Sequence, residues 1–276
     1  MQLPGGIMTD GRLESAIHLA PMRGHIELTL AELADLDVSQ PAMVSRFIAA
    51  TIDRIGSADC DDALAGQLSV GDRHYLVRVI GAALGHNRIW LKSQCRQCGE
   101  IFEIAIEQDK LPVKPASADF PRAAFDLHGQ IYQLRVPNGH DQQIIAEHLA
   151  SGMNETAARS ALARMLLEPN YTGQFEEADL ARLEQVLEAM APEVADRAQS
   201  NCPECDAPVE IEIDPYLSLQ QASDEIFSDI NVLARHYHWS EAAILAMPRT
   251  RRKLYLRLID RDRGMQVQPE GTAGPP

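Results

Sequence analysis

Four cysteines stand in two Cys-x-x-Cys pairs, a residue type and spacing that binds a tetrahedral metal ion. The first pair is Cys95 and Cys98, and the second is Cys202 and Cys205. The pairs open two similar stretches of sequence, CRQCGEIFEIAIE and CPECDAPVEIEID. Two such turns supply four thiolates, and a tight turn also points backbone N–H groups at the sulfur atoms. The pattern predicts one structural Zn²⁺ ion held by all four cysteines.

The long separation of the two pairs is unusual for a zinc ribbon. There are 103 residues between Cys98 and Cys202, whereas compact ribbons have roughly 15 to 20. A shared site therefore requires that the segment between the pairs be an inserted domain whose ends come close together. Zn–S bonds of roughly 2.3 Å would then place the four sulfur atoms within about 4 Å of one another.

Other uses of the two pairs stay open on sequence grounds. A dithiol redox pair normally opens a helix, whose dipole lowers the thiol pKa, but these pairs lead into alternating, strand-like runs. Free thiols without a metal, and metal sites that join two chains, are further alternatives. Within the zinc interpretation, a closed site of four thiolates leaves no position for water and indicates a structural role.

Composition and charge limit the remaining classes of function. The N-terminus lacks a basic region followed by an apolar block, and no apolar run has the roughly 20 residues of a membrane span, so we expect a soluble intracellular protein. Cys60 stands alone among acidic residues and is expected to be an ordinary thiol. The net charge is −15, which argues against general binding to nucleic acid or anionic membranes.

Hydrophobic periodicity predicts the α+β class, with a zinc-ribbon-like β element, a large helical insertion and flanking helices. We expect an N-terminal hairpin or arm (1–38), helices with a split zinc-ribbon sheet (39–138 and 199–216), a helical insertion (139–198), C-terminal helices (217–263) and a disordered tail (264–276).

Individual elements follow from the same patterns. The expected helices are 40–55, 70–84 with Ser69 as its cap, 142–150 with Asp141 as its cap, 156–167, 177–198, 223–239, 241–247 after the cap Ser240, and 249–263. The expected strands are 87–94 and 100–107 around the first cysteine pair, a hairpin over 124–137 with His128-Gly129 at its turn, and 207–215.

No arrangement of catalytic residues is predicted. Asp72, Arg73 and His74 have the residue types of a proton relay, but consecutive helical residues point in different directions, and Asp72 better suits a capping role. His236 and His238 lie two positions apart near a helix end and are also expected to diverge. The sequence contains no Gly-rich phosphate loop and no nucleophile motif.

The segment 249–263 is basic, although the chain as a whole is acidic. It has seven Arg or Lys against two Asp, so its net charge is +5 and the rest of the chain carries −20. Its interspersed leucines favour packing on the same chain or on a partner over contact with nucleic acid. Residues predicted to bind a partner are Trp239, Arg249, Arg251, Arg252 and Tyr255.

Several stretches, taken in order, resemble a known family of viral proteins. They are LPGGIMTDGRLESAIHLAPMRGHIE, LSVGDRHYLVRVIGAALG, CRQCGEIFEIAIE, HGQIYQLRVPNGHDQ, CPECDAPVEIEID and INVLARHYHWSEAAILAMPRTRRKLYLRLI. In this order the chain resembles the baseplate proteins of contractile-tailed phages, which include the T-even baseplate hub assembly proteins. Related proteins occur in phage-tail-like injection systems, and the resemblance covers most of residues 3–260.

The resemblance implies a non-enzymatic role in building a tail baseplate, with zinc organising the fold and the helices binding other baseplate or tail proteins. It also implies assembly in the bacterial host cytoplasm, and leaves open whether the protein stays in the finished tail. No membrane or small-molecule substrate is expected. A zinc-ribbon adaptor associated with nucleic acid and a dithiol redox protein are the alternatives.

Overall fold

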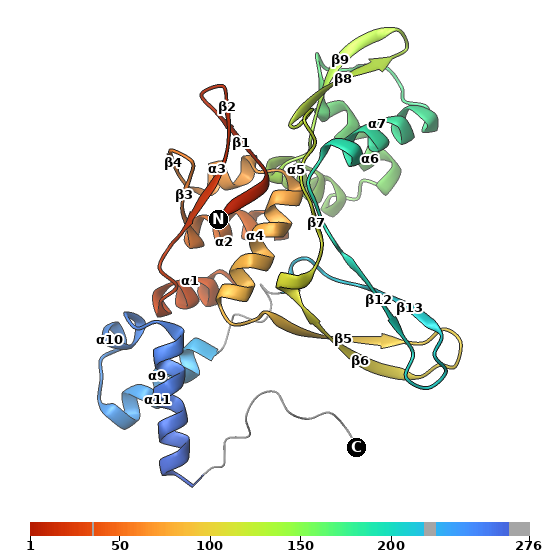
Figure 1. Cartoon of the computed structure of the whole chain (residues 1–276). Helices are drawn as coiled ribbons and strands as arrows, with labels where there is room; N and C mark the ends of the chain where they lie inside the picture. The colour runs from red at the N-terminus through yellow and green to blue at the C-terminus, as the bar shows by residue number, and fades with distance from the viewer. Residues whose placement is uncertain (35, 218–224, 265–276) are drawn as a thin grey trace.

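The computed structural model describes residues 1–34, 36–217 and 225–264, and over these ranges the chain belongs to the α+β class, as predicted. Figure 1 shows a central body from which three smaller parts project. One part is an inserted module of a hairpin and helices, one is a pair of β-hairpins, and one is the C-terminal group of helices. The paired cysteines lie on the pair of hairpins, outside the central body.

The central body combines an antiparallel sheet of order β1-β2-β3-β4 with four helices. Its elements are β1 (Gln2–Thr9), β2 (Arg12–Leu19), α1 (Gly24–Ala34), α2 (Gln40–Thr51), β3 (Ile52–Ile55), β4 (Ala58–Asp59), α3 (Asp62–Gln67) and α4 (Val70–Ala83). The predicted N-terminal hairpin is present, with Asp10 and Gly11 in the left-handed conformation at its turn. The hairpin is not a separate arm, because β2 pairs with β3 and Leu3, Ile7 and Ile17 are buried in the core.

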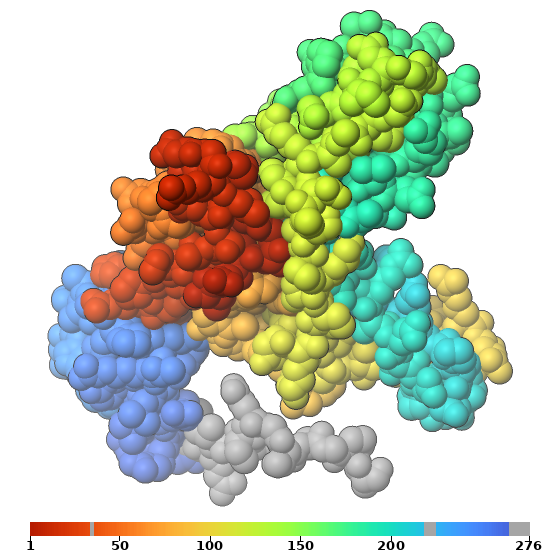
Figure 2. All heavy atoms as spheres, turned by 45° about the horizontal axis from the view of Figure 1, so that its top comes forward, coloured from red at the N-terminus to blue at the C-terminus, as the bar shows by residue number. Residues whose placement is uncertain are grey.

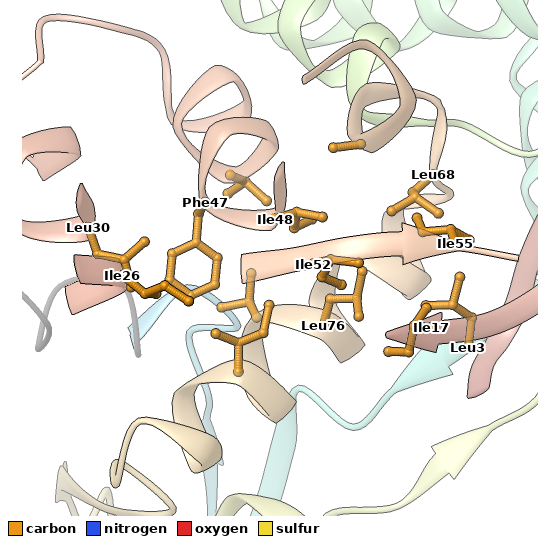
Figure 3. Close-up of a cluster of buried hydrophobic side chains, with 14 of the residues drawn as sticks. Leu3, Ile17, Ile26, Leu30, Phe47, Ile48, Ile52, Ile55, Leu68 and Leu76 are labelled. Carbon is orange, nitrogen blue, oxygen red and sulfur yellow. The ribbon is translucent and has the colours of Figure 1, made fainter. Parts of the chain in front are cut away.

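The core of the body lies where helices α2 and α4 meet this sheet. Figure 3 shows side chains from both helices and from the sheet gathered around strand β3. Ile48 and Leu76 have no exposed surface, and Phe47 is 2% exposed. Replacing one buried side chain of this kind by alanine typically costs about 2–5 kcal/mol. This cluster contains none of the four paired cysteines, so the body has its own source of stability.

The helix predicted over 40–55 is wrong in its last turn. Helix α2 ends at Thr51, and the next four residues form β3. The apolar spacing there suits a helix or a strand. The strand prevails because pairing with β2, through Ile17 and Ile55, satisfies the backbone groups while keeping the isoleucines buried.

Helix α4 agrees with its prediction, and its first turn explains why three adjacent polar residues do not form a relay. Ser69 caps the helix by accepting a hydrogen bond from the N–H of Asp72. Asp72 does not itself cap the helix, because its carboxylate accepts hydrogen bonds from N–H groups of β1. Arg73 donates to α2 and α3, and His74 contacts Tyr216. The three side chains therefore point into different regions, as expected.

The inserted module begins and ends at a short two-stranded sheet. Strands β7 (Val113–Lys114) and β11 (Glu193–Val194) pair antiparallel, so the chain enters and leaves the module side by side. Between them lie β8 (Arg122–Leu127), β9 (Gln130–Arg135), α5 (Gly139–Ala150), α6 (Glu155–Leu166), β10 (Leu167–Glu168) and α7 (Glu177–Met190). The insertion was expected to begin at 139, but the hairpin β8–β9 forms a sheet with β10 and shares a core with α6 and α7. The hairpin therefore belongs to the module, and its turn is His128-Gly129, as predicted.

Helix α5 has a different cap from the one predicted. Asn138 is the N-cap residue, and its side chain accepts a hydrogen bond from the N–H of Asp141. The Asp141 side chain accepts one from the Asn138 N–H in return, completing a capping box. Asp141 also forms a two-pronged ion pair with Arg135 at 2.6 and 2.7 Å. The acid thus joins the helix start to β9.

The helix predicted over 177–198 ends early, at Met190. Pro192 follows, and proline disfavours the helical conformation of the residue before it. The rest of the predicted helix forms β11 and β12 (Arg197–Asn201), and β12 pairs with β13 (Pro208–Glu212). The second cysteine pair therefore lies at the tip of a complete hairpin.

The C-terminal helices are α9 (Glu225–Tyr237), α10 (Glu241–Leu245) and α11 (Arg249–Asp262). Ser240 caps α10, as predicted, by accepting a hydrogen bond from the N–H of Ala243. The start of the helix predicted at 223 and nearly all of the tail predicted as disordered (264–276) lie outside the described residues. Among the helices that the structure describes, none is long and apolar enough to cross a membrane.

Candidate metal centre

Both cysteine pairs occupy the same position on similar β-hairpins. The first pair joins β5 (Arg88–Gln94) to β6 (Ile101–Glu107), and the second joins β12 to β13. The last paired residues before each turn are Gln94 with Ile101 and Asn201 with Pro208. Each Cys-x-x-Cys sequence therefore forms a turn of equal length between two strands, which we call a knuckle.

The two knuckles share one pattern of backbone hydrogen bonds. The N–H of Cys95 and that of Cys202 each donate to the carbonyl oxygen five residues later, at 2.8 and 2.9 Å. The carbonyl oxygens of the same two cysteines accept from the N–H four residues later, at 3.0 and 2.9 Å. The residue after the second cysteine is Gly99 in one knuckle and Asp206 in the other, and both have positive φ (79° and 58°). The sequence similarity thus reflects a true repeat of backbone structure.

The four sulfur atoms converge. Cys95 Sγ lies 3.6 Å from Cys205 Sγ, and Cys98 Sγ lies 3.6 Å from Cys202 Sγ. All four sulfur atoms lie within 4.8 Å of one another. A tetrahedron with Zn–S bonds of about 2.3 Å has S–S edges of about 3.8 Å. The cluster, which we call the four-cysteine cluster, could therefore hold a metal ion, and all four residues are free thiols.

The cluster has an approximate two-fold arrangement. Each short sulfur contact joins the first cysteine of one knuckle to the second cysteine of the other. Both first cysteines, Cys95 and Cys202, are buried, whereas Cys98 is exposed and Cys205 is partly exposed. The two knuckles therefore face each other as equivalent halves, with one inner and one outer sulfur in each half.

The surroundings of the two sulfurs in the first knuckle favour a thiolate at Cys95 and a protonated thiol at Cys98. Backbone N–H groups of Cys98 and Gln97 lower the pKa of Cys95 to about 6. At Cys98 the N–H of Glu100 also lowers the pKa, but desolvation and the neighbouring thiols outweigh it and raise that pKa to about 12. Several thiolates at this distance repel one another, so a bound cation is what would let all four ionise.

The strands behind the knuckles pack face to face and do not form one sheet. β5 pairs with β6 and β12 pairs with β13, in two separate two-stranded sheets. The split single sheet expected from the sequence is therefore incorrect. Apolar side chains fill the space between the hairpins near the cysteines, among them Phe102, Ile104, Val209 and Ile211. This small core holds the hairpins together and directs the two knuckles toward each other.

The basic helix α11 is anchored within its own chain. Arg252 is fully buried and donates a hydrogen bond to Glu27 of α1, which is itself buried. Arg249 donates a hydrogen bond from Nη1 to the same carboxylate at 2.8 Å. The carboxylate of the buried Asp229 in α9 lies 3.7 Å from Nε of Arg252 and 3.2 Å from Nζ of Lys253. We call these five residues the C-terminal clasp.

Of the residues predicted to bind a partner, most make contacts within their own chain, and Arg251 is exposed. Arg252 and Arg249 serve the C-terminal clasp, and an interior side chain such as Arg252 cannot present its charge to a partner. Trp239 stacks on Tyr237 with ring centroids 4.5 Å apart, and Tyr255 contacts both rings edge-on, so Trp239 is a packing anchor between helices. Arg251 is exposed and lies over the Tyr255 ring.

Sequence reasoning did not single out Glu27 or the exposed Trp90. Glu27 lies in a helix that the pattern did not predict, and it is one of 40 acidic residues. Trp90 is 57% exposed on the outer face of β5, although tryptophan is usually well buried. The sequence of β5 indicates the exposure of Trp90, because side chains alternate between the two faces of a strand. Ile89 and Leu91 face the core, so Trp90 between them must face outward.

Comparison with known proteins identifies no relative: no family model, no curated protein and no solved structure matches this chain.

Proposed function

We propose that this protein is a non-enzymatic structural or assembly component of the baseplate of a contractile phage tail or injection system, organised by one structural zinc ion. The observation that carries the proposal is the convergence of two equivalent knuckles, whose facing cysteines are up to 110 positions apart in the chain. Such a connection fixes the shape of a binding surface without supplying a reaction, which is what an assembly protein requires.

Zinc is the metal that the ligands favour. Four thiolates in a tetrahedral arrangement select Zn²⁺ or iron–sulfur chemistry, and a closed set of four cysteines on two hairpins is typical of structural zinc. The zinc-ribbon identity of this part rests on the two knuckles and their hairpins. Zinc would link the start and the end of the inserted module, because β6 leads into the module and β12 follows it.

Exposed apolar side chains support a role in binding other proteins. Trp90 and Ile101 are 57% and 53% exposed on the first cysteine hairpin, and Met8 pairs with Leu13 on the exposed tip of the β1–β2 hairpin. Figure 2 shows the inserted module and the cysteine hairpins standing out from the body as separate lobes. Aromatic side chains on projecting parts are characteristic of interface anchors, and we assign other baseplate or tail proteins as the partners.

The surroundings of the reactive side chains support a non-enzymatic role. Burial raises the pKa of Cys60 to about 12, with Asp61 and Asp62 adding to the effect, so this thiol is a poor nucleophile. Burial lowers the pKa of His74 to about 4, so this ring stays neutral at physiological pH and serves its contact with Tyr216. Neither residue has the poised pKa that acid–base catalysis uses.

The nucleic-acid adaptor is the weaker alternative because the cysteine hairpins are not basic. The groove beside the four-cysteine cluster is lined by Arg96 and Gln97 on one side and by Glu210 and Glu212 on the other. A phosphate backbone would meet two carboxylates there. Tight and steeply salt-dependent binding to DNA would reverse this order of preference.

A gene deletion tests the proposed function. In a strain that produces contractile particles from the gene cluster containing this gene, deletion should abolish complete baseplates, and electron microscopy should show tails that are missing or incomplete. Re-expression of the wild-type chain should restore them, whereas a Cys202→Ser variant should not. Normal contractile particles from the deletion strain would exclude the proposed role.

A further inference from the structure

A second feature of the molecule lies far from the four-cysteine cluster. One face of α4 forms a wall of a pocket of about 480 Å³, and the opposite wall is the segment between η1 (Gln108–Lys110) and β7. The apolar lining comes from Met1, Tyr75, Val79, Ala82, Ala83, Leu111 and Val113. A volume of this size falls in the range of small-molecule sites, which are also mostly apolar with few polar groups.

Arg78 lines this pocket, and its guanidinium has an unpaired nitrogen. The residue is 6% exposed, and its Nη1 atom has no hydrogen-bond partner among the described residues. Its closest aromatic neighbour is Tyr75, whose ring centroid lies 6.0 Å from the guanidinium carbon. Asp109 also lines the pocket, but its carboxylate accepts a hydrogen bond from Asn87 and forms no ion pair with Arg78 in the described structure.

Two other buried arginines, Arg73 and Arg252, also have one buried nitrogen, Nε, without a hydrogen-bond partner, but both of their Nη atoms are paired, whereas Arg78 has no hydrogen bond or ion pair among the described residues. Arg73 donates from Nη1 to Ser45 and Ala65 and from Nη2 to Pro41. Arg252 donates to Glu27 in the C-terminal clasp and to a backbone carbonyl. An unpaired buried donor on a cation is costly, and such a group usually has an anion or a polar atom beside it.

We propose that this pocket binds an aliphatic monocarboxylate of medium chain length. The carboxylate would accept hydrogen bonds from Arg78, and the chain would lie along the apolar wall of α4 and against Leu111 and Val113. A buried guanidinium recognises a carboxylate through charge-assisted hydrogen bonds. The lining favours a hydrocarbon over a peptide, because the amide groups of a peptide would find few partners among valine, alanine and leucine side chains.

The pocket and the four-cysteine cluster share no residue. The inference is therefore independent of the proposed baseplate role, and neither depends on the other being correct.

Calorimetric titration with decanoate tests the proposal on the full, metal-loaded chain. We expect saturable binding of one decanoate per chain, and binding of decan-1-ol at least roughly tenfold weaker, because the alcohol lacks the charge that pairs with the guanidinium. Equal binding of acid and alcohol, tighter binding of N-acetylleucine than of decanoate, or no binding would each overturn the proposal.

Two variants and one control locate the site. Arg78→Met keeps an unbranched apolar side chain in place of the arginine methylenes but removes the guanidinium and its charge, and should weaken decanoate binding roughly tenfold or more. Ala83→Phe should block the pocket from its exposed side with Arg78 intact. The control Arg12→Met changes an exposed arginine on the N-terminal hairpin and should bind decanoate as the wild type does.

The stability of the ligand-free variant separates binding from a structural role. Because Arg78→Met removes an unpaired buried charge, its thermal midpoint without ligand should equal or exceed that of the wild type. A marked fall would mean that the charge is satisfied within the fold, and would contradict the proposal. Unchanged decanoate binding by Ala83→Phe would contradict it as well, and this variant serves if Arg78→Met does not fold.

Discussion

The four-cysteine cluster and the C-terminal clasp join distant parts of the chain by different chemistry. The four-cysteine cluster connects residues up to 110 positions apart, and the C-terminal clasp connects Glu27 to Arg252, 225 positions apart. The first uses one residue type in two equivalent knuckles, whereas the second uses acids and bases from α1, α9 and α11. A long-range contact can be recognised in a sequence when its chemistry requires a fixed local spacing, and is otherwise hidden.

The two connections should also differ in strength. Metal–thiolate bonds of a structural zinc contribute directly to the free energy of folding. Buried ion pairs gain less, because the cost of removing the charges from water offsets much of their attraction. Breaking a buried pair is nevertheless expensive, since one charge then remains buried without its partner.

The largest effect is expected from Cys202→Ser. Cys202 is 2% exposed and is one of the two buried cysteines of the cluster, so its loss should abolish metal binding and lower the free energy of unfolding by on the order of 5 kcal/mol or more. Chemical denaturation of the wild type and the variant measures this change. The matched control is Cys60→Ser, which should retain the metal and lose at most a small part of the stability.

A smaller effect is expected from Arg252→Met in the C-terminal clasp. The substitution leaves Glu27 and Asp229 buried with less compensation, which should cost about 3–5 kcal/mol. Metal content should not change. The control is Arg257→Met, an exposed position on the same helix. If Arg252→Met proved as stable as this control, the clasp would contribute no net stability.

One hydrogen bond connects the central body to the segment that follows the second cysteine hairpin. His74 Nε2 lies 2.9 Å from the hydroxyl of Tyr216, which follows β13, and burial lowers the pKa of His74 from 6.5 to about 4. The unfolded chain therefore takes up a proton between about pH 6.5 and 4 that the folded chain does not. The stability contributed by the neutral ring is complete above pH 6.5 and is lost as the pH falls toward 4.

Comparison of the wild type with His74→Gln isolates this contribution. The difference in their unfolding free energies should change by up to about 3 kcal/mol between pH 6.5 and 4. Release of a metal from the four-cysteine cluster in acid would be common to both proteins and would cancel from the difference. A difference that does not vary with pH would mean that His74 titrates normally in the folded protein.

The smallest change in stability is expected from substitutions at the residue that follows the second cysteine of each knuckle. Gly99→Ala places a Cβ at φ +79°, where alanine is strained but meets no other atom within 4 Å. It should therefore cost about 1 kcal/mol. Asp206 already occupies the equivalent position with φ +58°, so Asp206→Gly should have little or no cost there. Equal losses in both variants would argue against the equivalence of the knuckles.

The cluster was predictable because its signal is local. Two Cys-x-x-Cys pairs and the alternating strands after them indicate ligand type, turn and strand without knowledge of the rest of the fold. The start of α4 was also predictable, since the capping residue Ser69 and the apolar stripe of the helix follow one another in one short stretch of sequence.

The errors in the prediction have a common physical cause. Ile52–Ile55 and Glu193–Val194 form strands because they pair with residues far away in sequence, and periodicity does not reveal those partners. The hairpin β8–β9 was assigned to the wrong unit for the same reason. Glu27 was missed because only the folded chain brings it to Arg252.

X-ray absorption at the zinc edge, on protein purified under reducing conditions and quantified for metal, identifies the metal and its ligand atoms. We predict one zinc per chain with four sulfur neighbours at about 2.3 Å. We also predict loss of the metal when any one of Cys95, Cys98, Cys202 or Cys205 is changed to serine. Metal-free protein with a reversible disulfide, or zinc bound by nitrogen or oxygen ligands, would contradict these predictions.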